Sequence, residues 1–226
     1  MIYKVVLKVV FLLIALLSST IILAQDLSIG YEIGLISSSN SDYNRLDIEN
    51  RRNTDYFGVN FQKTMNQSIS FGSGLQFLKQ GYKHGTCYIV PDDVKNEVVG
   101  KLNYLVVPAT INTHLGKSKR FIANFGIYGA VNIKAVQDIP DEIIGGCAIG
   151  YIDNLRRFTK RFGVGGILEL GYEVYRHDKF QINTLVKYYQ GFSNTKKYPD
   201  PNVIVPWMAK YNSAIISVSL NYKIGI

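Results

Sequence analysis

Residues 27–35 read LSIGYEIGL, and their side chains alternate strictly between large apolar groups and small or polar ones. The odd positions carry Leu, Ile, Tyr, Ile and Leu, whereas the even positions carry Ser, Gly, Glu and Gly. A period of two is that of a β-strand, in which successive side chains point to opposite faces. The stretch therefore predicts a strand with one apolar face and one polar face.

The same alternation returns along the rest of the chain in seven further segments. They comprise residues 54–64, 69–77, 102–115, 121–133, 162–173, 180–188 and 213–222. The connections are alternately long and short, with short turns at 66–67, 117–119 and 176–178. An even number of antiparallel strands, with short turns at one end and long loops at the other, is the layout of a bacterial outer-membrane barrel. We therefore predict an all-β fold, namely an eight-stranded antiparallel transmembrane β-barrel of the up-and-down type.

Alternation alone also fits a soluble eight-stranded barrel, which turns its apolar face inward. Three features favour the membrane: charged side chains fall on the polar faces, aromatic side chains lie near strand ends, and the short turns share a side with both termini. A Lys or Arg at the lipid midplane costs about 2–4 kcal/mol, so faces without charge suit lipid. The charges predicted to face the lumen are Glu32, Glu169, Glu173, Lys187 and Arg120.

The polar faces are rich in Gly and Ser, which suits the narrow lumen of an eight-stranded barrel. A charge buried in such a lumen is tolerated only when it is paired and hydrogen-bonded. Glu169 and Lys187 fall on adjacent predicted strands, and we expect them to pair. Such a pair could serve as a gate or a proton path, but a structural plug is the simpler interpretation.

Residues 1–24 have the layout of a secretory signal peptide. Lys4 and Lys8 lie around the start of an apolar run that is followed by small residues, with cleavage expected after Ala24. The alternative is an uncleaved membrane anchor, because the apolar part approaches the length of about 20 residues that spans a bilayer. The barrel domain would comprise residues 25–226, in the outer membrane of a Gram-negative bacterium.

The formal net charge of +8 is compatible with attraction to anionic surfaces, whereas the secretory leader argues against nucleic acid as a partner. Beyond the cytoplasm the environment is oxidising, so Cys87 and Cys147 could form a disulfide between two long loops. Both cysteines could equally remain free.

Two stretches, YLVVPA at 104–109 and GIYG at 126–129, resemble the "YLxxP … GxY" core of the outer-membrane beta-barrel domain proteins of Bacteroidetes, the group that includes PorT-type proteins. FGVGG at 162–166 and KYYQGFSN at 187–194 are similar to two further stretches of that family. The resemblance spans nearly all of the mature chain and implies a barrel and its location, but little chemistry. Pro108 belongs to the pattern, and since a proline cannot donate to the strand ladder we expect a local bulge there.

Motifs that carry chemistry are missing from the sequence. His84, His114 and His177 are dispersed without ligand spacing, and neither a nucleophile elbow nor a phosphate loop is present. We therefore predict no catalytic residue, no metal and no cofactor. The long loops hold a basic cluster, Arg156, Arg157, Lys160 and Arg161, which could meet lipopolysaccharide phosphates or could simply be a solvated face.

These observations predict a monomeric, non-enzymatic protein with a structural or surface-interaction role. Its expected partners are outer-membrane lipid and lipopolysaccharide, together with secretion or envelope proteins. The alternative functions are a PorT-like accessory of protein secretion and a small channel. A lipid A-modifying enzyme is a weaker alternative, since it needs a serine and a histidine at the lipid-facing rim and His114 falls on an inward face.

Overall fold

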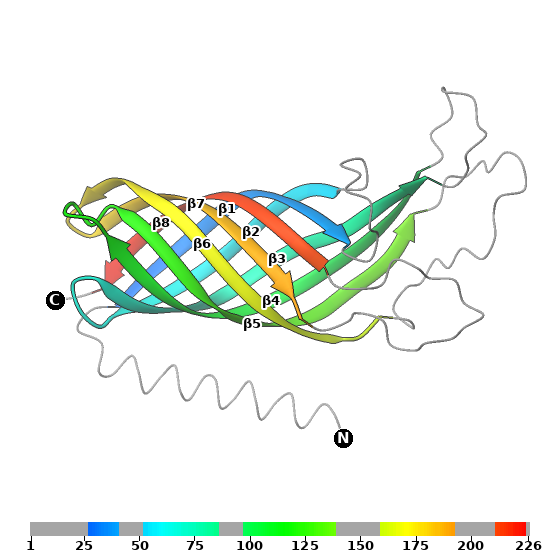
Figure 1. The fold of residues 1–226 in the computed structure, drawn as a ribbon, viewed down its shortest axis with the longest axis horizontal. Helices are drawn as coiled ribbons and strands as arrows, with labels where there is room; N and C mark the ends of the chain where they lie inside the picture. Colours follow the sequence, from blue (N-terminus) through cyan, green and yellow to red (C-terminus); the bar gives the residue numbers. More distant parts are fainter. Residues whose placement is uncertain (1–26, 41–51, 86–96, 139–158, 193–210, 225–226) are drawn as a thin grey trace, which may run out of the picture.

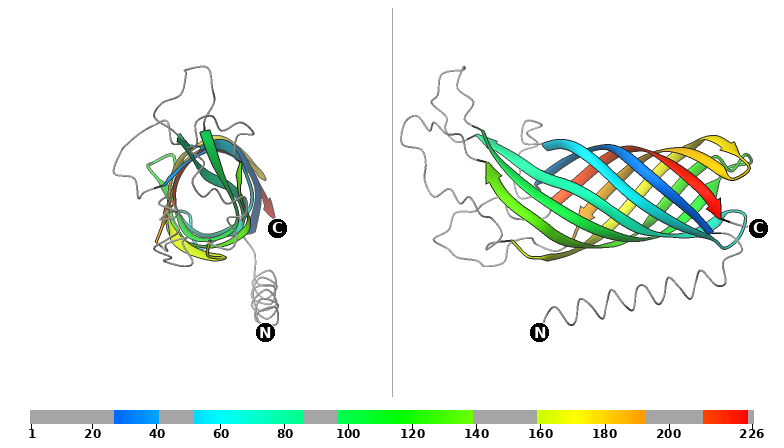
Figure 2. Two further views of the ribbon diagram at one scale, coloured as in Figure 1. Left: turned by 90° about the vertical axis from the view of Figure 1, so that its right-hand side faces the viewer. Right: turned by 180° about the vertical axis from the view of Figure 1, so that it is seen from behind.

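The computed structural model describes residues 27–40, 52–85, 97–138, 159–192 and 211–224. The described residues form eight strands: β1 (Leu27–Asn40), β2 (Arg52–Thr64), β3 (Ile69–Gly85), β4 (Glu97–Leu115), β5 (Phe121–Asp138), β6 (Phe162–His177), β7 (Phe180–Gly191) and β8 (Tyr211–Ile224). Each strand pairs with its chain neighbours in antiparallel orientation, and β8 pairs with β1 to close the barrel (Figures 1 and 2). The predicted fold class is confirmed. The described ranges contain no helix that could span a bilayer.

The three short turns lie together at the end of the barrel where β1 begins and β8 ends (Figure 1). In the first turn the Asn66 side chain accepts hydrogen bonds from the backbone N–H groups of Ser68 and Ile69, both at 2.9 Å. The second turn uses left-handed backbone conformations at Gly116 (φ 81°) and Lys119 (φ 52°). This short-turn end matches the periplasmic end of outer-membrane barrels.

The two faces of each strand differ as the alternation predicts. Outward side chains are apolar and exposed, as shown by Ile33 at 68%, Ile127 at 65% and Ile216 at 69% relative exposure. Inward polar groups are buried, with Glu32 and Glu169 at 1% and 5%. A soluble barrel would reverse this arrangement, so the outer face is that of a barrel surrounded by lipid.

The inner face is divided into two halves, which the alternation did not predict. Toward the long-loop end the lumen is filled by a packed apolar cluster of twelve buried residues: Ile36, Tyr56, Leu78, Leu102, Tyr104, Val106, Tyr128, Ala130, Ala135, Ile167, Tyr189 and Ile215. Toward the short-turn end the inward side chains are mainly Asn, Gln, Ser and Thr. The lumen is therefore packed like a protein core in its outer half and polar in its inner half.

The bulge predicted at Pro108 is wrong. Pro108 stays in register with Tyr128 of β5, and the β3–β4 register is the same before and after it, although the ladder lacks paired residues there. The hydroxyl of Ser73 on β3 donates to the Pro108 carbonyl oxygen at 2.9 Å. The side chain of Ser73 thus supplies a donor to the Pro108 carbonyl where the ladder lacks paired residues, and β4 keeps its register without an extra residue.

Two register shifts do occur elsewhere. In the β4–β5 pair, Asn103 faces Lys134 while Tyr104 faces Asn132, so β5 carries one extra residue. In the β6–β7 pair, Glu173 and Tyr175 face consecutive residues of β7, so Val174 is extra. An extra residue exchanges the inward and outward faces of the strand beyond it.

Candidate functional site

Three of the predicted lumen charges meet inside the barrel. Lys187 of β7 is 2% exposed, and its Nζ lies 2.7 Å from Oε2 of Glu32 and 3.0 Å from Oε1 of Glu169. Glu169 lies directly opposite Lys187 in the β6–β7 register, whereas Glu32 reaches the same ammonium group from β1. The expected Glu169–Lys187 pair is thus present, and Glu32 makes it a three-residue cluster.

The carboxylates of this charged cluster are also hydrogen-bonded. Asn124 Nδ2 donates to Oε2 of Glu169 at 2.8 Å, and Asn60 Nδ2 donates to Oε2 of Glu32 at 2.7 Å. The hydroxyl of Ser217 donates to the other oxygen of Glu32. The charged cluster carries one positive and two negative formal charges, and its oxygens are held by the amide and hydroxyl donors that buried carboxylates require.

Two buried tyrosines separate the charged cluster from the apolar half of the lumen. Lys187 Nζ lies 3.5 Å from the Tyr56 hydroxyl oxygen and 5.6 Å from the centroid of its ring. The Tyr189 hydroxyl donates to Oε1 of Gln76 at 2.5 Å, and Nε2 of Gln76 donates to Oδ1 of Asn60 at 3.4 Å. The tyrosines thus present hydroxyl groups to the polar side and rings to the apolar cluster.

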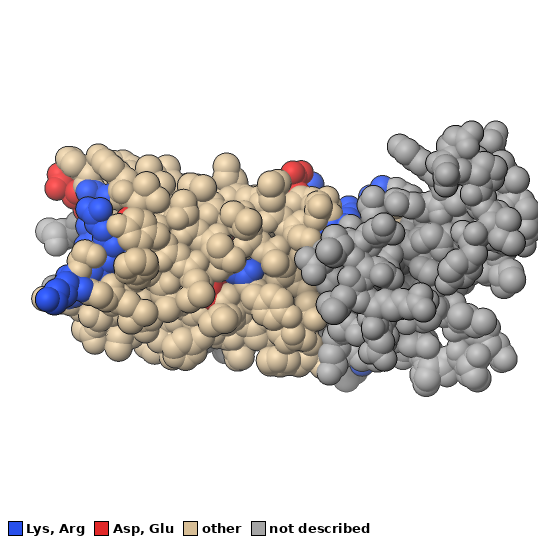
Figure 3. Space-filling model, turned by 45° about the horizontal axis from the view of Figure 1, so that its top comes forward, with Lys and Arg blue, Asp and Glu red and all other residues tan. Residues whose placement is uncertain are grey.

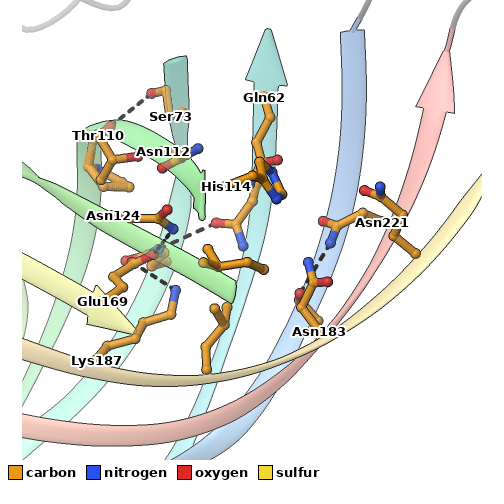
Figure 4. A pocket seen from close by; sticks show the side chains of 18 residues that line it. Gln62, Ser73, Thr110, Asn112, His114, Asn124, Glu169, Asn183, Lys187 and Asn221 are labelled. Carbon is orange, nitrogen blue, oxygen red and sulfur yellow. Dashed lines mark hydrogen bonds and ion pairs between the residues drawn. The ribbon is translucent and has the colours of Figure 1, made fainter. Parts of the chain in front are cut away.

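On the short-turn side the charged cluster adjoins a small polar cavity of about 30 Å³ (Figure 4). Buried amide oxygens of Asn112, Asn124 and Asn183 have no hydrogen-bond partner among the described residues. All three residues line this cavity. Because a site of at least about 10–15 Å³ can hold one water molecule, the cavity suits one or two waters and no larger solute.

Glu173, the fourth predicted lumen charge, is 1% exposed but lies apart from the charged cluster. It pairs with Arg176, whose Nε and Nη2 lie 2.5 and 2.6 Å from the two carboxylate oxygens. The sequence did not indicate Arg176 as a lumen residue, because strict alternation from Glu173 places it outward. The extra residue Val174 returns it to the inner face opposite Gln181, and the alternation in the sequence gives no sign of this shift.

The other candidate residues from the sequence do not belong to the charged cluster. Lys160 and Arg161 are exposed just before β6 at the long-loop end, where the Arg161 carbonyl accepts from the Asn132 N–H at 2.7 Å. Arg120 is exposed in the turn before β5, and His114 is half-buried on the inner face. Arg156, Arg157, Cys87, Cys147 and the predicted signal peptide 1–24 lie outside the described residues.

No grouping of three potential metal ligands occurs among the described residues. The charged cluster holds a lysine between carboxylates, so its oxygens are already occupied by hydrogen bonds and an ammonium group. The arrangement can crosslink β1 to β6 and β7 across the interior of the barrel and so block its lumen.

Comparison with solved structures finds small outer-membrane proteins of low sequence identity. Neisserial surface protein A is 12% identical, with 88% of this chain and 97% of that chain covered and a TM-score of 0.49. Ail of Yersinia pestis, solved with the heparin analogue sucrose octasulfate, is 13% identical, with 88% and 99% covered and a TM-score of 0.44. Escherichia coli outer membrane protein W is 14% identical, with 89% and 98% covered and a TM-score of 0.40.

Comparison with curated proteins gives no match. The family described as "Outer membrane protein beta-barrel domain" matches residues 23–197, which include strands β1 to β7. The β8 strand, which closes the barrel against β1, lies beyond the matched range. The chain therefore belongs to the outer membrane protein beta-barrel domain family.

Proposed function

We propose that this small outer-membrane barrel is a closed, non-enzymatic scaffold whose task is surface interaction rather than conduction. The observation that carries the proposal is the sealed lumen: the apolar cluster fills its outer half, and the charged cluster ties β1, β6 and β7 together beneath it. The polar cavity next to the charged cluster measures about 30 Å³. A channel for solutes would need a continuous polar passage instead.

Conductance in planar lipid bilayers tests this proposal. The wild-type barrel should give no discrete openings, because ions meet the buried rings of Tyr56 and Tyr189. The Tyr189→Gly variant removes one of these rings and serves as a control that the assay detects an opened lumen. Regular wild-type openings that match those of the variant would refute the closed scaffold and favour the small-channel alternative.

The proposed partners at the long-loop end are outer-membrane lipid and lipopolysaccharide. Exposed Lys160 and Arg161 lie at this end, and cations there can make charge-assisted contacts with lipopolysaccharide phosphates. The double variant Lys160→Gln/Arg161→Gln should bind lipopolysaccharide more weakly than wild type. Lys117→Gln changes an exposed charge at the opposite end and is the matched control, and equal weakening in both would contradict the assignment.

The PorT-like resemblance supports a second candidate, an accessory of protein secretion that acts through the same scaffold. It rests on the stretches at 104–109 and 187–194, and the second of these supplies Lys187 to the charged cluster. A deletion strain should then lose secreted proteins from the culture medium while its outer membrane stays intact. Unchanged secretion would contradict the role as an accessory of protein secretion.

An enzymatic role at the lipid-facing rim has little support. His114 is half-buried on the inner face, where its Nδ1 donates to the Lys119 carbonyl oxygen at 3.2 Å. His177 is exposed beside Asp178 in the turn between β6 and β7. The contacts of these two described imidazoles are with Lys119 and Asp178 rather than with a serine, and we propose no catalytic residue.

A further inference from the structure

The short-turn mouth of the barrel forms a cavity of about 450 Å³. Inward side chains of Ser70, Gln62, Gln181 and Lys223 contribute to its wall. Gln62, His114 and Gln181 line both this mouth and the small polar cavity deeper inside. The mouth is thus the wide, open end of the polar half of the lumen, and the small polar cavity lies between it and the charged cluster.

The described lining of this mouth carries a net positive charge. Lys119, Arg176, Lys179 and Lys223 line it, and the described lining contains a single carboxylate, Asp178, while buried Glu173 compensates Arg176. In the part of the chain that the structure describes, no carboxylate lies within ion-pair distance of Lys119, Lys179 or Lys223. Figure 3 shows Lys and Arg gathered at this end of a barrel whose drawn side is otherwise mostly uncharged.

Several of these groups are held in place by the protein itself. Two nitrogens of Arg176 bind the two oxygens of buried Glu173. Lys119 Nζ donates to Oε1 of Gln67 at 2.8 Å, while the Lys119 carbonyl accepts from His114. A site whose donors are ordered in advance loses less conformational entropy when a ligand binds.

The mouth also contains an unpaired donor. Ser70 is 5% exposed and lines the cavity, yet its hydroxyl has no hydrogen-bond partner among the described residues. A buried hydroxyl without a partner costs free energy, which a ligand oxygen or a water molecule recovers. The hydroxyl and the cations face the same recess.

We propose that this mouth is an oxyanion site that binds a phosphate group from the periplasmic side. Several cations around one recess favour a group with more than one negative oxygen, and Lys and Arg both form charge-assisted hydrogen bonds with phosphate. The phosphate belongs either to a soluble phosphate compound or to the headgroup of an anionic phospholipid, since this end lies at the inner leaflet. The site goes beyond the proposed function, which concerns the opposite end of the barrel.

The test is a titration of the isotope-labelled barrel in dodecyl maltoside, a detergent without phosphate, followed by NMR. Pyrophosphate and dihexanoyl phosphatidylglycerol are the two probes. The amide signals of Ser70, Gln181 and Lys223 should shift and saturate. The double variant Lys179→Gln/Lys223→Gln, at two exposed positions, should raise the dissociation constant about tenfold or more, because each loses a hydrogen bond to a charged group.

Lys134→Gln is the matched control, since Lys134 is an exposed lysine near the long-loop end of β5 and its loss should leave the dissociation constant unchanged. Saturation at lower concentrations of phosphatidylglycerol identifies a headgroup, and saturation at lower concentrations of pyrophosphate identifies a soluble ligand. The proposal is overturned if neither probe saturates, or if Lys134→Gln weakens binding as much as the double variant does.

Discussion

Replacing Lys187 by Met should destabilise the barrel far more than replacing either glutamate partner by Gln. The ammonium group lies 2.7 Å from Glu32 and 3.0 Å from Glu169, so each attraction amounts to about 6 kcal/mol at an effective dielectric constant of about 20. Because both oxygens contact one nitrogen, they are no more than about 6 Å apart and repel each other by at least about 3 kcal/mol once the lysine is gone. After desolvation is counted, breaking a buried pair costs about 3–5 kcal/mol.

Glu169→Gln should have a much smaller effect. The variant can keep its amide oxygen on Lys187 and donate from its NH2 group to Oδ1 of Asn124 once that amide turns over. It also leaves Lys187 paired with Glu32 and removes the repulsion between the two carboxylates. We expect a loss of about 1 kcal/mol or less in the free energy of unfolding, the size of one ordinary hydrogen bond. The triple variant Lys187→Met/Glu32→Gln/Glu169→Gln should recover most of the stability lost in Lys187→Met.

Urea unfolding of the barrel from phospholipid vesicles, followed by circular dichroism, measures these differences. The order of the variants matters more than the absolute values, since the latter depend on the lipid. If Lys187→Met loses no more stability than Glu169→Gln, the ammonium group does not hold the two carboxylates together and the electrostatic reasoning is refuted.

Three further perturbations test other layers of the barrel. Tyr189→Phe removes the hydroxyl that donates to a buried glutamine and should cost about 1–2 kcal/mol in the same urea assay; an unchanged midpoint would contradict that bond. Ile127→Lys puts a charge on the lipid face and should lower the free energy of unfolding by about 2–4 kcal/mol. Ile224→Lys, at the end of β8, should lower it by only about 0–1 kcal/mol, and equal losses would argue against burial of the outer face in lipid. Gly126→Ala should reduce the folded fraction on heat-modifiable gels because a β-carbon there meets a main-chain carbonyl of β4, whereas Gly129→Ala has open space and should fold normally.

The alternation along the strands was sufficient to predict the barrel, because lipid and lumen impose opposite chemistry on successive residues. The positions of Glu32, Glu169 and Lys187 on the inner face followed from the same rule, and adjacency of two strands led to the Glu169–Lys187 pair. Glu32 could not be added from the sequence alone. It reaches Lys187 from β1, so the contact depends on how the closed barrel brings distant inward faces together.

Two features escaped prediction for physical reasons. The apolar cluster contains inward residues such as Leu102 and Ile215 that break the polar pattern, and at the sequence level they resemble irregularities rather than a packed layer. The place of Arg176 depends on the extra residue Val174, and an insertion of one residue reverses the faces without any compositional sign. At Pro108 the strand keeps its register and the Ser73 hydroxyl donates to the proline carbonyl, a side-chain contact that the alternation does not reveal.

The packed apolar layer has a consequence for how this protein can change over time. All members of the apolar cluster lie on the strands themselves. The packing that the cluster supplies therefore does not depend on the segments that connect the strands at the long-loop end. We therefore expect that changes in the length and sequence of these segments leave the barrel folded, because the apolar cluster and the charged cluster lie on the strands. The residues that stabilise the barrel are thus separate from the segments that join its strands at the long-loop end.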